Sequence, residues 1–251
     1  MLALRLCLFI FMEMKKAIII GATSGIGKSL AEILLLKVYA VGVTGRREEL
    51  FHSIKTQETS KFVYRKMDVQ DLSTIEPTCN ELVCQMSGLD LLIISAGIGD
   101  ENKNLNFDVV HSVIKTNIQG FTCIADWSLR YFKKQAYGHL VNISTIAGIR
   151  GNGIAPSYNA TKAYQINYLE GLRINAKEYG SRITITDARP GFVNTAMAKG
   201  EGLFWVAPVK KAATQIFEAI KQKKKVVYIT KRWRLIALFL RIIPFSILKR
   251  V

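Results

Sequence analysis

Short apolar runs alternate with helical patterns along most of the chain. The four strongest runs are rich in branched aliphatic residues, which predicts strands buried on both faces, as in a parallel sheet. They are Ala17–Ile20, Val38–Val43, Leu89–Ile94 and His139–Ile143. Three weaker runs complete the series: Phe62–Arg65, Ile183–Thr186 and Lys225–Ile229. Because strands and helices alternate, the pattern predicts an α/β fold with a parallel sheet covered by helices and right-handed crossovers.

This alternation is not interrupted by an internal repeat, a low-complexity tract or a linker rich in proline and glycine. A chain of 251 residues is long enough for one large α/β core, so we expect a single domain. The segment from Phe192 to Ala207 has little periodicity and contains Gly200 and Gly202, so we expect a loop. Because it follows a predicted strand end, it is a candidate lid over a ligand site, and Pro208 would start the next helix.

Composition narrows the class of protein. Hydrophobic residues make up 49% and charged residues 22% of the chain, which is ordinary for a globular protein and excludes a wholly disordered or fibrous one. The net charge is +16, but from Lys221 onwards there are ten Lys or Arg and no Asp or Glu. The preceding residues contain 25 basic and 19 acidic side chains, a net +6. No nucleic-acid recognition motif accompanies the charge, so we expect no nucleic-acid partner.

The N-terminal segment stands apart from the predicted domain, which covers residues 14–230. Residues 1–13 are largely apolar but are too short to span a bilayer and lack a small-residue cleavage site. Since Met12 or Met14 would make a more natural start, we interpret residues 1–13 as an extension upstream of the natural start. A short membrane-touching anchor is the alternative.

A basic, hydrophobic tail covers residues 231–251. Arg241 and Pro244 interrupt its apolar stretches, which argues against a spanning helix and favours either of two arrangements. In the first arrangement the tail would lie in a membrane interface, where its apolar and basic residues would both attract it to anionic lipid. Alternatively, it packs across the protein's own substrate entrance or a subunit interface.

The four cysteines, Cys7, Cys79, Cys84 and Cys123, form no CxxC pair and have no metal-ligand spacing with the three histidines. We therefore expect no metal site and a reducing, cytoplasmic compartment, with peripheral membrane association as an addition that the tail suggests.

A glycine-rich turn follows the first predicted strand. It opens a helix that continues to about Leu36, and its glycines permit a tight turn and close approach to a pyrophosphate, while the helix N-terminus attracts negative charge. The candidate cofactor-binding residues of the turn are Gly21, Thr23, Ser24, Gly25, Ile26 and Gly27. A glycine-rich turn that binds no nucleotide is the alternative.

Two arginines occupy the position that distinguishes the two nicotinamide cofactors. The second predicted strand ends in Thr44-Gly45-Arg46-Arg47, where an NAD-binding protein would carry Asp or Glu for the adenosine ribose. A guanidinium there suits a 2′-phosphate, so Arg46 and Arg47 favour NADP(H) over NAD(H). The alternative is two solvated arginines at the start of a helix.

Candidate catalytic residues lie in the second half of the chain. Tyr158 and Lys162 are four residues apart in a helical pattern that continues to about Lys177, so they share a face. A nearby ammonium would stabilise the phenolate of a tyrosine, whose ordinary pKa is about 10. Ser144 ends a predicted strand fourteen positions before Tyr158, and Asn117 lies earlier.

From about Lys15 to Ile229, the chain resembles the short-chain dehydrogenase/reductase family. The resemblance rests on GATSGIG, TNIQG, NIST, YNATK and RPGFVNT, in that order. It implies a doubly wound Rossmann-type sheet of seven strands in one domain. It also implies a catalytic tetrad of Asn117, Ser144, Tyr158 and Lys162.

The same resemblance implies further cofactor contacts. Asp68 and Val69 would meet the adenine. The nicotinamide end would be held by residues of RPGFVNT, namely Pro190, Gly191, Val193 and Thr195. Ala96 and Gly97 would support the cofactor, although this chain has Ile94-Ser95-Ala96-Gly97 where the family often has Asn-Asn-Ala-Gly. That departure affects cofactor support more than catalysis.

The implied reaction is hydride transfer between NADP(H) and a carbonyl or secondary alcohol, with reduction as the expected direction. Ser144 would hydrogen-bond the substrate carbonyl, Tyr158 would donate the proton and Lys162 would stabilise its phenolate, while Asn117 would orient a water joining that lysine to solvent. The alternatives are a non-catalytic NADP(H)-binding sensor or scaffold, and a membrane-associated reductase of a lipid-like ketone. We expect a small-molecule carbonyl or alcohol as substrate, and a homodimer or homotetramer.

Overall fold

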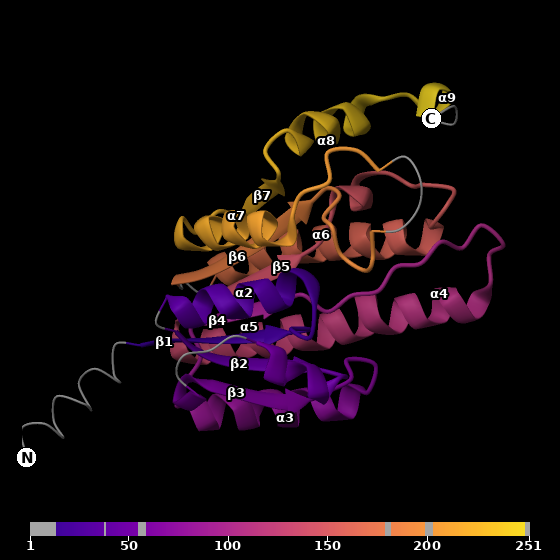
Figure 1. Ribbon diagram of the computed structural model, residues 1–251. Coiled ribbons are helices and arrows are strands. Elements are labelled where there is room, and N and C mark those ends of the chain that lie inside the picture. The colour runs from indigo at the N-terminus through magenta and orange to yellow at the C-terminus, as the bar shows by residue number, and fades with distance from the viewer. Residues whose placement is uncertain (1–13, 38, 55–58, 179–181, 199–202, 249–251) are drawn as a thin grey trace, which may run out of the picture.

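The computed structural model describes residues 14–37, 39–54, 59–178, 182–198 and 203–248. Within these ranges, seven strands form one parallel sheet in the order β3-β2-β1-β4-β5-β6-β7 (Figure 1). The strands are β1 Lys15–Ile20, β2 Tyr39–Gly45, β3 Phe62–Lys66, β4 Leu91–Ile94, β5 Tyr137–Ile143, β6 Arg182–Pro190 and β7 Val226–Ile229. The predicted Rossmann-type fold is therefore confirmed. The strand order reverses between β1 and β4, which is where open α/β sheets bind their ligands.

Every predicted apolar run overlaps one of these strands. The largest difference is in β6, which continues four residues beyond the predicted end at Thr186, to Pro190. Asp187 and Arg189 break the apolar pattern there, yet Asp187 pairs with both β5 and β7, and Arg189 pairs with β7. Val38, predicted to start the second strand, lies outside the described residues.

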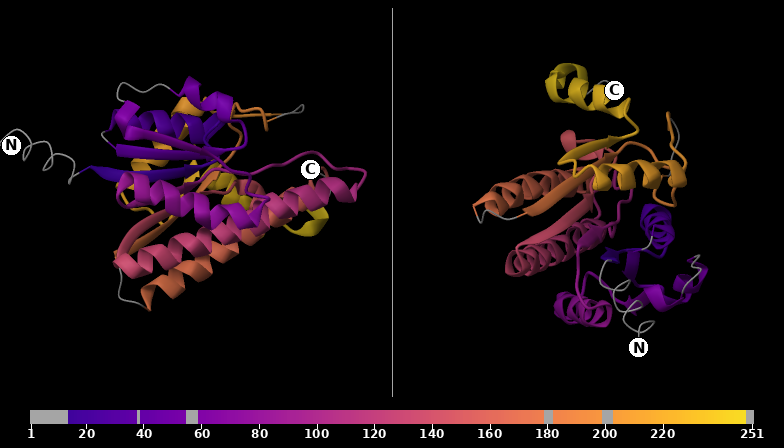
Figure 2. Two further views of the ribbon diagram at one scale, coloured as in Figure 1. Left: turned by 90° about the horizontal axis from the view of Figure 1, so that it is seen from below. Right: turned by 90° about the vertical axis from the view of Figure 1, so that its left-hand side faces the viewer.

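Helices cover both faces of the sheet. The helical elements are α2 Gly25–Leu36, η1 Glu48–Ser53, η2 Thr59–Lys61, α3 Leu72–Met86, α4 Phe107–Ile114, η3 Lys115–Gly120, α5 Phe121–Gln135, η4 Ile146–Ile149, α6 Pro156–Lys177, α7 Val209–Lys221, α8 Trp233–Ile242 and α9 Phe245–Leu248. Helices α2 and α7 pack against each other on one face, and α3, α5 and α6 cover the other (Figures 1 and 2). Pro208 immediately precedes α7, as expected for a proline at a helix start.

The core consists of two apolar clusters, one on each side of the sheet. Successive strand side chains point to opposite faces, so Ile19 packs towards α2 and α7, whereas Ile18 and Ile20 pack towards α3 and α5. All three are fully buried. Burial of both faces is the reason why the strands appear in the sequence as continuous apolar runs rather than as an apolar–polar alternation.

The C-terminal helices α8 and α9 lie beyond the edge strand β7, at the end of the sheet opposite β3 (Figures 1 and 2). One side of α8 packs on the protein, because Trp233 and Ala237 are almost completely buried, and Arg150 donates a hydrogen bond to the carbonyl of Ile243. No helix in the described part of the chain combines the length and apolar character needed to cross a bilayer. Residues 1–13, Gly200, Gly202 and residues 249–251 lie outside the described ranges.

Candidate active site

The glycine-rich turn connects β1 to α2 at the centre of the sheet. Gly21 has φ +87°, in the left-handed region that favours glycine, and a Cβ atom there would lie 2.6 Å from the backbone nitrogen of Ala96. A Cβ atom on Gly27 would collide with the carbonyl oxygen of Gly21. The turn is thus packed tightly against the segment that follows β4, and only glycine fits at these two positions.

The N-terminus of α2 is open to an anion. Ser24 precedes the helix without capping it through its side chain, and the first turn contains no acidic residue. The backbone N–H groups at a helix start have no partner within the helix, so they can bind phosphate oxygens. A Cβ atom on Gly25 would lie 3.4 Å from the methyl carbon Cγ2 of Thr195, so the predicted nicotinamide-end segment lies beside the turn. These features fit a dinucleotide.

Of the two arginines after β2, only Arg47 reaches the turn. Its Nη2 atom lies 3.2 Å from Thr23 Oγ1 and 3.3 Å from Ser24 Oγ. Arg46 is exposed and makes no hydrogen bond or ion pair with any described residue. The structure therefore favours Arg47 as the residue positioned to bind a phosphate beside the turn.

The predicted adenine contacts follow β3. Asp68 accepts a hydrogen bond of 3.0 Å from the backbone N–H of Gln70, which shapes the turn after the strand. Val69 is buried, and Gly120 packs directly on its carbonyl group. Both residues therefore lie at the carboxyl edge of the sheet, on the same side of the molecule as the glycine-rich turn.

Tyr158 and Lys162 share one face of α6, as predicted. The Lys162 Nζ atom lies 5.9 Å from the centroid of the Tyr158 ring. Burial lowers the pKa of Lys162 to about 8, and the nearby carboxylate of Asp187 opposes this shift. Burial raises the pKa of Tyr158 to about 12, against a smaller lowering by its hydrogen bond with the Thr145 side chain. The tyrosine is therefore held protonated beside an ammonium that could stabilise its phenolate.

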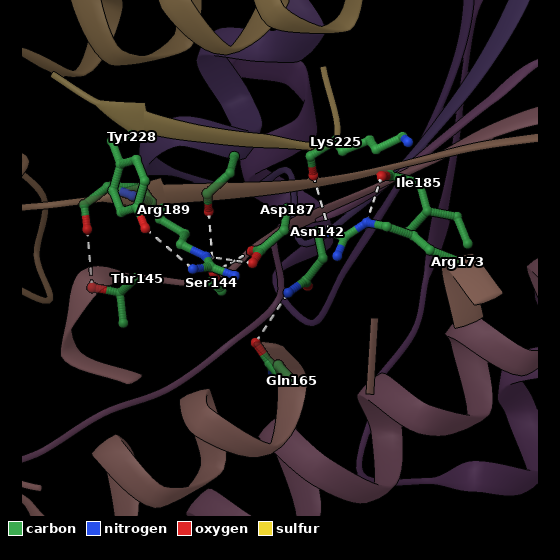
Figure 3. A network of polar contacts seen from close by, with 12 residues as sticks. Asn142, Ser144, Thr145, Gln165, Arg173, Ile185, Asp187, Arg189, Lys225 and Tyr228 are labelled. Atoms are coloured by element: carbon green, nitrogen blue, oxygen red, sulfur yellow. Dashed lines mark hydrogen bonds and ion pairs between the residues drawn. The ribbon is translucent and has the colours of Figure 1, made fainter. Parts of the chain in front are cut away.

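Ser144 does not face Tyr158, which corrects the sequence-based assignment. Its hydroxyl donates to the carboxylate of Asp187, which is completely buried and paired with Arg189 (Figure 3). The next residue, Thr145, is extended, with φ −169° and ψ 164°, so its side chain points the opposite way. The Thr145 hydroxyl is the one near Tyr158.

The Thr145 hydroxyl also touches the predicted nicotinamide-end segment. It donates to the carbonyl oxygen of Pro190 at 3.0 Å and accepts from the backbone N–H of Ala147 at 3.3 Å. A hydroxyl has one proton, so donating to a substrate carbonyl would require rotation away from Pro190. Sequence reasoning missed Thr145 because Ser144 beside it carries a hydroxyl as well.

Asn117 is buried in η3, a single π-helical turn between α4 and α5. Its side chain holds the segment after β4 through two hydrogen bonds. Nδ2 donates to the Ile98 carbonyl at 2.7 Å, and Oδ1 accepts from the Ile98 N–H at 3.0 Å. A Cβ atom on Gly97 would lie 3.4 Å from both Asn117 Oδ1 and Lys162 Nζ. Asn117, Gly97 and Lys162 are thus brought together, and π-helical turns often mark functional sites.

Gln165 joins Asn117 to Lys162 directly, and the sequence analysis did not predict a role for this residue. Its Oε1 atom accepts from Lys162 Nζ at 3.0 Å, and its Nε2 atom donates to the Asn117 carbonyl oxygen at 2.8 Å. Asn142 Nδ2 also donates to Oε1, at 3.2 Å (Figure 3). Gln165 is completely buried. The sequence feature that could have identified Gln165 is its position three residues after Lys162, as a polar residue on the buried face of α6.

The remaining predicted residues line the loop that follows β6. A Cβ atom on Gly191 would collide with the indole of Trp233 in α8, so no other residue fits there. Val193 forms an isolated bridge with Ala207, which closes the ends of the loop against each other. Phe204 and Trp205 contact the Trp233 ring at centroid distances of 5.1 and 5.7 Å. The loop is therefore held by aromatic packing on the C-terminal tail.

Together these groups can bind a dinucleotide and handle a proton. The open helix start beside Arg47 suits phosphates, and a phenol, a hydroxyl and an ammonium converge at the carboxyl ends of β5 and β6. This combination can polarise a carbonyl and donate a proton to the oxygen that forms from it.

Comparison with known proteins agrees with this arrangement. The sequence model of the short chain dehydrogenase family matches residues 15–203. The 3-oxoacyl-[acyl-carrier-protein] reductase FabG of Aquifex aeolicus is 30% identical over 190 residues, covering 73% of this chain and 75% of that protein. An uncharacterized oxidoreductase of Myxococcus xanthus is 29% identical over 191 residues, covering 74% of this chain and 75% of the relative.

Solved structures share the fold. ElxO with NADP bound has a TM-score of 0.74 and 24% identity, covering 86% of this chain and 96% of its own. A short-chain dehydrogenase from Streptomyces avermitilis has a TM-score of 0.78 and 20% identity, covering 91% of this chain and 92% of its own. At these identities the similarity establishes the architecture alone.

Proposed function

Because the chain belongs to the short-chain dehydrogenase family and is therefore an NAD(P)-dependent oxidoreductase, we propose that it is an NADPH-dependent carbonyl reductase. The observation that carries this proposal is the convergence of Tyr158, Lys162 and Thr145 beside the glycine-rich turn. NADP bound to a protein of the same fold supports the choice of cofactor. The reductase activity of FabG supports the direction, because that relative reduces a 3-oxoacyl group.

Each residue of the site has a distinct role in the proposed carbonyl reduction. When bound, the cofactor supplies the hydride. Thr145 donates a hydrogen bond to the substrate carbonyl, and Tyr158 donates the proton to the alkoxide that forms. Lys162 stabilises the resulting phenolate, which offsets the burial that raises the pKa of Tyr158. Gln165 and Asn117 hold Lys162 in place.

The test is NADPH consumption with a panel of carbonyl compounds that includes 3-oxoacyl thioesters, medium-chain ketones and aldehydes. We expect turnover of at least one class, with the alcohol as product. NADPH binding without any turnover on the panel would favour the alternative, a non-catalytic sensor or scaffold.

Arg47→Ala is expected to weaken NADPH binding about tenfold and to leave NADH binding unchanged. The reason is the loss of a charge-assisted hydrogen bond to the 2′-phosphate, which contributes about 1.5 kcal/mol or more. Fluorescence titration with both cofactors measures the effect. Arg46→Ala is the matched control, since Arg46 is its exposed neighbour and has no described partner. Equal losses for NADPH and NADH in Arg47→Ala would contradict the assignment.

Gln165→Leu is expected to move the alkaline limb of the kcat–pH profile to lower pH by about one unit. The carboxamide oxygen stabilises the charged form of Lys162, whose pKa is about 8, so its removal favours the neutral amine and lets the proton leave at lower pH. Gln165→Glu should shift the limb the other way.

Gln135→Leu is the control for this pair, because Gln135 binds the carbonyl groups of Leu89 and Tyr137 away from the site. An alkaline limb that stays fixed in both Gln165 variants would show that Gln165 does not position Lys162.

We further propose that the enzyme acts in the cytoplasm as a homodimer or homotetramer and associates peripherally with membranes. The mass by light scattering and the distribution between soluble and membrane fractions test these two statements separately.

A further inference from the structure

Helix α8 presents apolar side chains on two sides. Trp233 and Ala237 point inwards and are 1% exposed. The opposite side carries Leu235, Leu238, Phe239 and Ile242, which are 71%, 59%, 55% and 71% exposed. The spacing of three and four residues places these four on one face. We call these four residues the outer face.

Four large exposed apolar side chains on one face of a helix beyond the sheet edge mark an interaction site. Its surroundings are cationic. Arg234 and Arg241 lie on the same helix, and no Asp or Glu occurs from Lys221 to the end of the chain. The outer face therefore combines apolar and basic character, as do helices that lie in the surface of an anionic bilayer.

A cationic groove lies beside the outer face, between α6, the β6–β7 edge and α8. It has a volume of about 420 Å³. It is lined by Glu170, Arg173, Arg189, Lys225, Val226, Tyr228 and Arg241. A smaller hollow of about 290 Å³ shares Tyr228 and Arg241 with it and adds Arg234, Leu235 and Leu238. The groove and the outer face thus meet along α8.

Two of the four cations that line the groove are bound by other groups of the protein, and the other two can bind a ligand. Arg189 is paired with Asp187 and approaches the Tyr228 hydroxyl, while Arg173 donates to the carbonyl groups of Ile185 and Lys225 (Figure 3). Within the described part of the chain, neither the Lys225 ammonium nor the Arg241 guanidinium has a hydrogen-bond or ion-pair partner. Glu170 is the single acidic residue of the lining.

We propose that the outer face docks on an anionic phospholipid bilayer and that the groove binds the phosphate of one headgroup. Apolar side chains enter the interface, while Lys225 and Arg241 neutralise a phosphate beside them. The proposal names the partner surface of the peripheral attachment proposed above and does not depend on the chemistry of the active site.

A second copy of the chain is a poorer occupant of the outer face. A two-fold interface would place the same surface on both partners, so Arg234 and Arg241 of each copy would face a surface equally rich in cations. Like charges brought together oppose association, whereas anionic lipid neutralises them.

The loop after β6 packs on the inner side of α8, so a bilayer on the outer face would lie across the helix from it. Trp233, on the inner side of α8, contacts Phe204 and Trp205, which are 48% and 43% exposed. The Arg232 guanidinium stacks on Trp205 at 4.7 Å.

The experiment is co-sedimentation of the full chain with phosphatidylcholine vesicles and with vesicles that also contain phosphatidylglycerol. We expect strong binding to the anionic vesicles, weakened by salt. The double variant Leu238→Ser/Phe239→Ser should lower the partition coefficient by about a hundredfold, because each side chain contributes roughly a tenfold change and the two effects multiply. Lys225→Gln/Arg241→Gln should lower it about tenfold on anionic vesicles only.

Ile174→Ser is the matched control, since Ile174 is a 61% exposed apolar residue on α6, outside the outer face. NADPH binding and thermal unfolding verify that each variant is folded. Absence of binding to anionic vesicles, equal binding to both vesicle types, or a dimer that dissociates in Leu238→Ser/Phe239→Ser would overturn the proposal. Since no readout uses turnover, failure of the docking surface is distinguishable from failure of the proposed reductase activity.

Discussion

Replacing Tyr158 by phenylalanine is expected to lower kcat by roughly a hundredfold or more, because general acid catalysis commonly contributes that factor. The ring would keep its packing against Gly99, so the site should retain its shape. NADPH affinity should stay close to that of the wild type, since the phenol hydroxyl acts on the carbonyl oxygen. Stopped-flow turnover together with fluorescence titration of NADPH separates the two quantities.

Tyr164→Phe provides the control for this result. Tyr164 lies on the same helix, and its hydroxyl shares a 2.9 Å hydrogen bond with Thr122, away from Lys162. Its removal should cost stability and leave kcat nearly unchanged. If Tyr158→Phe retained wild-type turnover, proton donation would have to come from another group and the proposed mechanism would fail.

The second large effect is expected at Thr145. Thr145→Ala should lower kcat roughly a hundredfold, the usual consequence of removing one donor to a developing oxyanion. Thr145→Ser keeps the hydroxyl and should recover most of the activity. The pair of variants is measured in steady-state kinetics with the best carbonyl of the panel.

Ser144→Ala is the neighbouring test, with the opposite expectation. The Ser144 hydroxyl donates to Asp187, which is buried and paired with Arg189. Its loss should destabilise the fold by about 1–3 kcal/mol, because a buried carboxylate loses a donor, while kcat per folded molecule changes much less. Thermal unfolding measures the first quantity. A large loss of kcat in Ser144→Ala together with an active Thr145→Ala would restore the original assignment.

Local sequence patterns, which act within a few residues, were sufficient to predict the strands, the glycine-rich turn and the shared face of Tyr158 and Lys162. Both faces of the sheet are buried, so each strand appeared in the sequence as an apolar run, and the alternation with helices predicted a parallel sheet. Gly21 and Gly27 signalled the turn because no other residue fits where the chain packs on itself. Tyr158 and Lys162 shared a face because a helical period of 3.6 brings residues four apart together.

Where two adjacent residues carry the same functional group, only the tertiary structure shows which of them faces the site. Ser144 and Thr145 both offer a hydroxyl, but in extended backbone they point to opposite sides, and the side that faces Tyr158 depends on where α6 packs. Arg46 and Arg47 are alike in sequence, and the path of the chain after β2 brings only Arg47 to the turn.

Contacts between distant segments were likewise outside the reach of the sequence. Gln165 in α6 donates a hydrogen bond to Asn117 in η3, which lies 48 positions earlier in the chain. A periodic sequence pattern relates only residues within one element, so it cannot predict this contact. The basic tail left two arrangements open, and the structure shows that one side of α8 packs on the loop after β6 while the other is exposed. Periodicity identifies a helix face, but what covers that face is determined by the shape of the surface on which it packs.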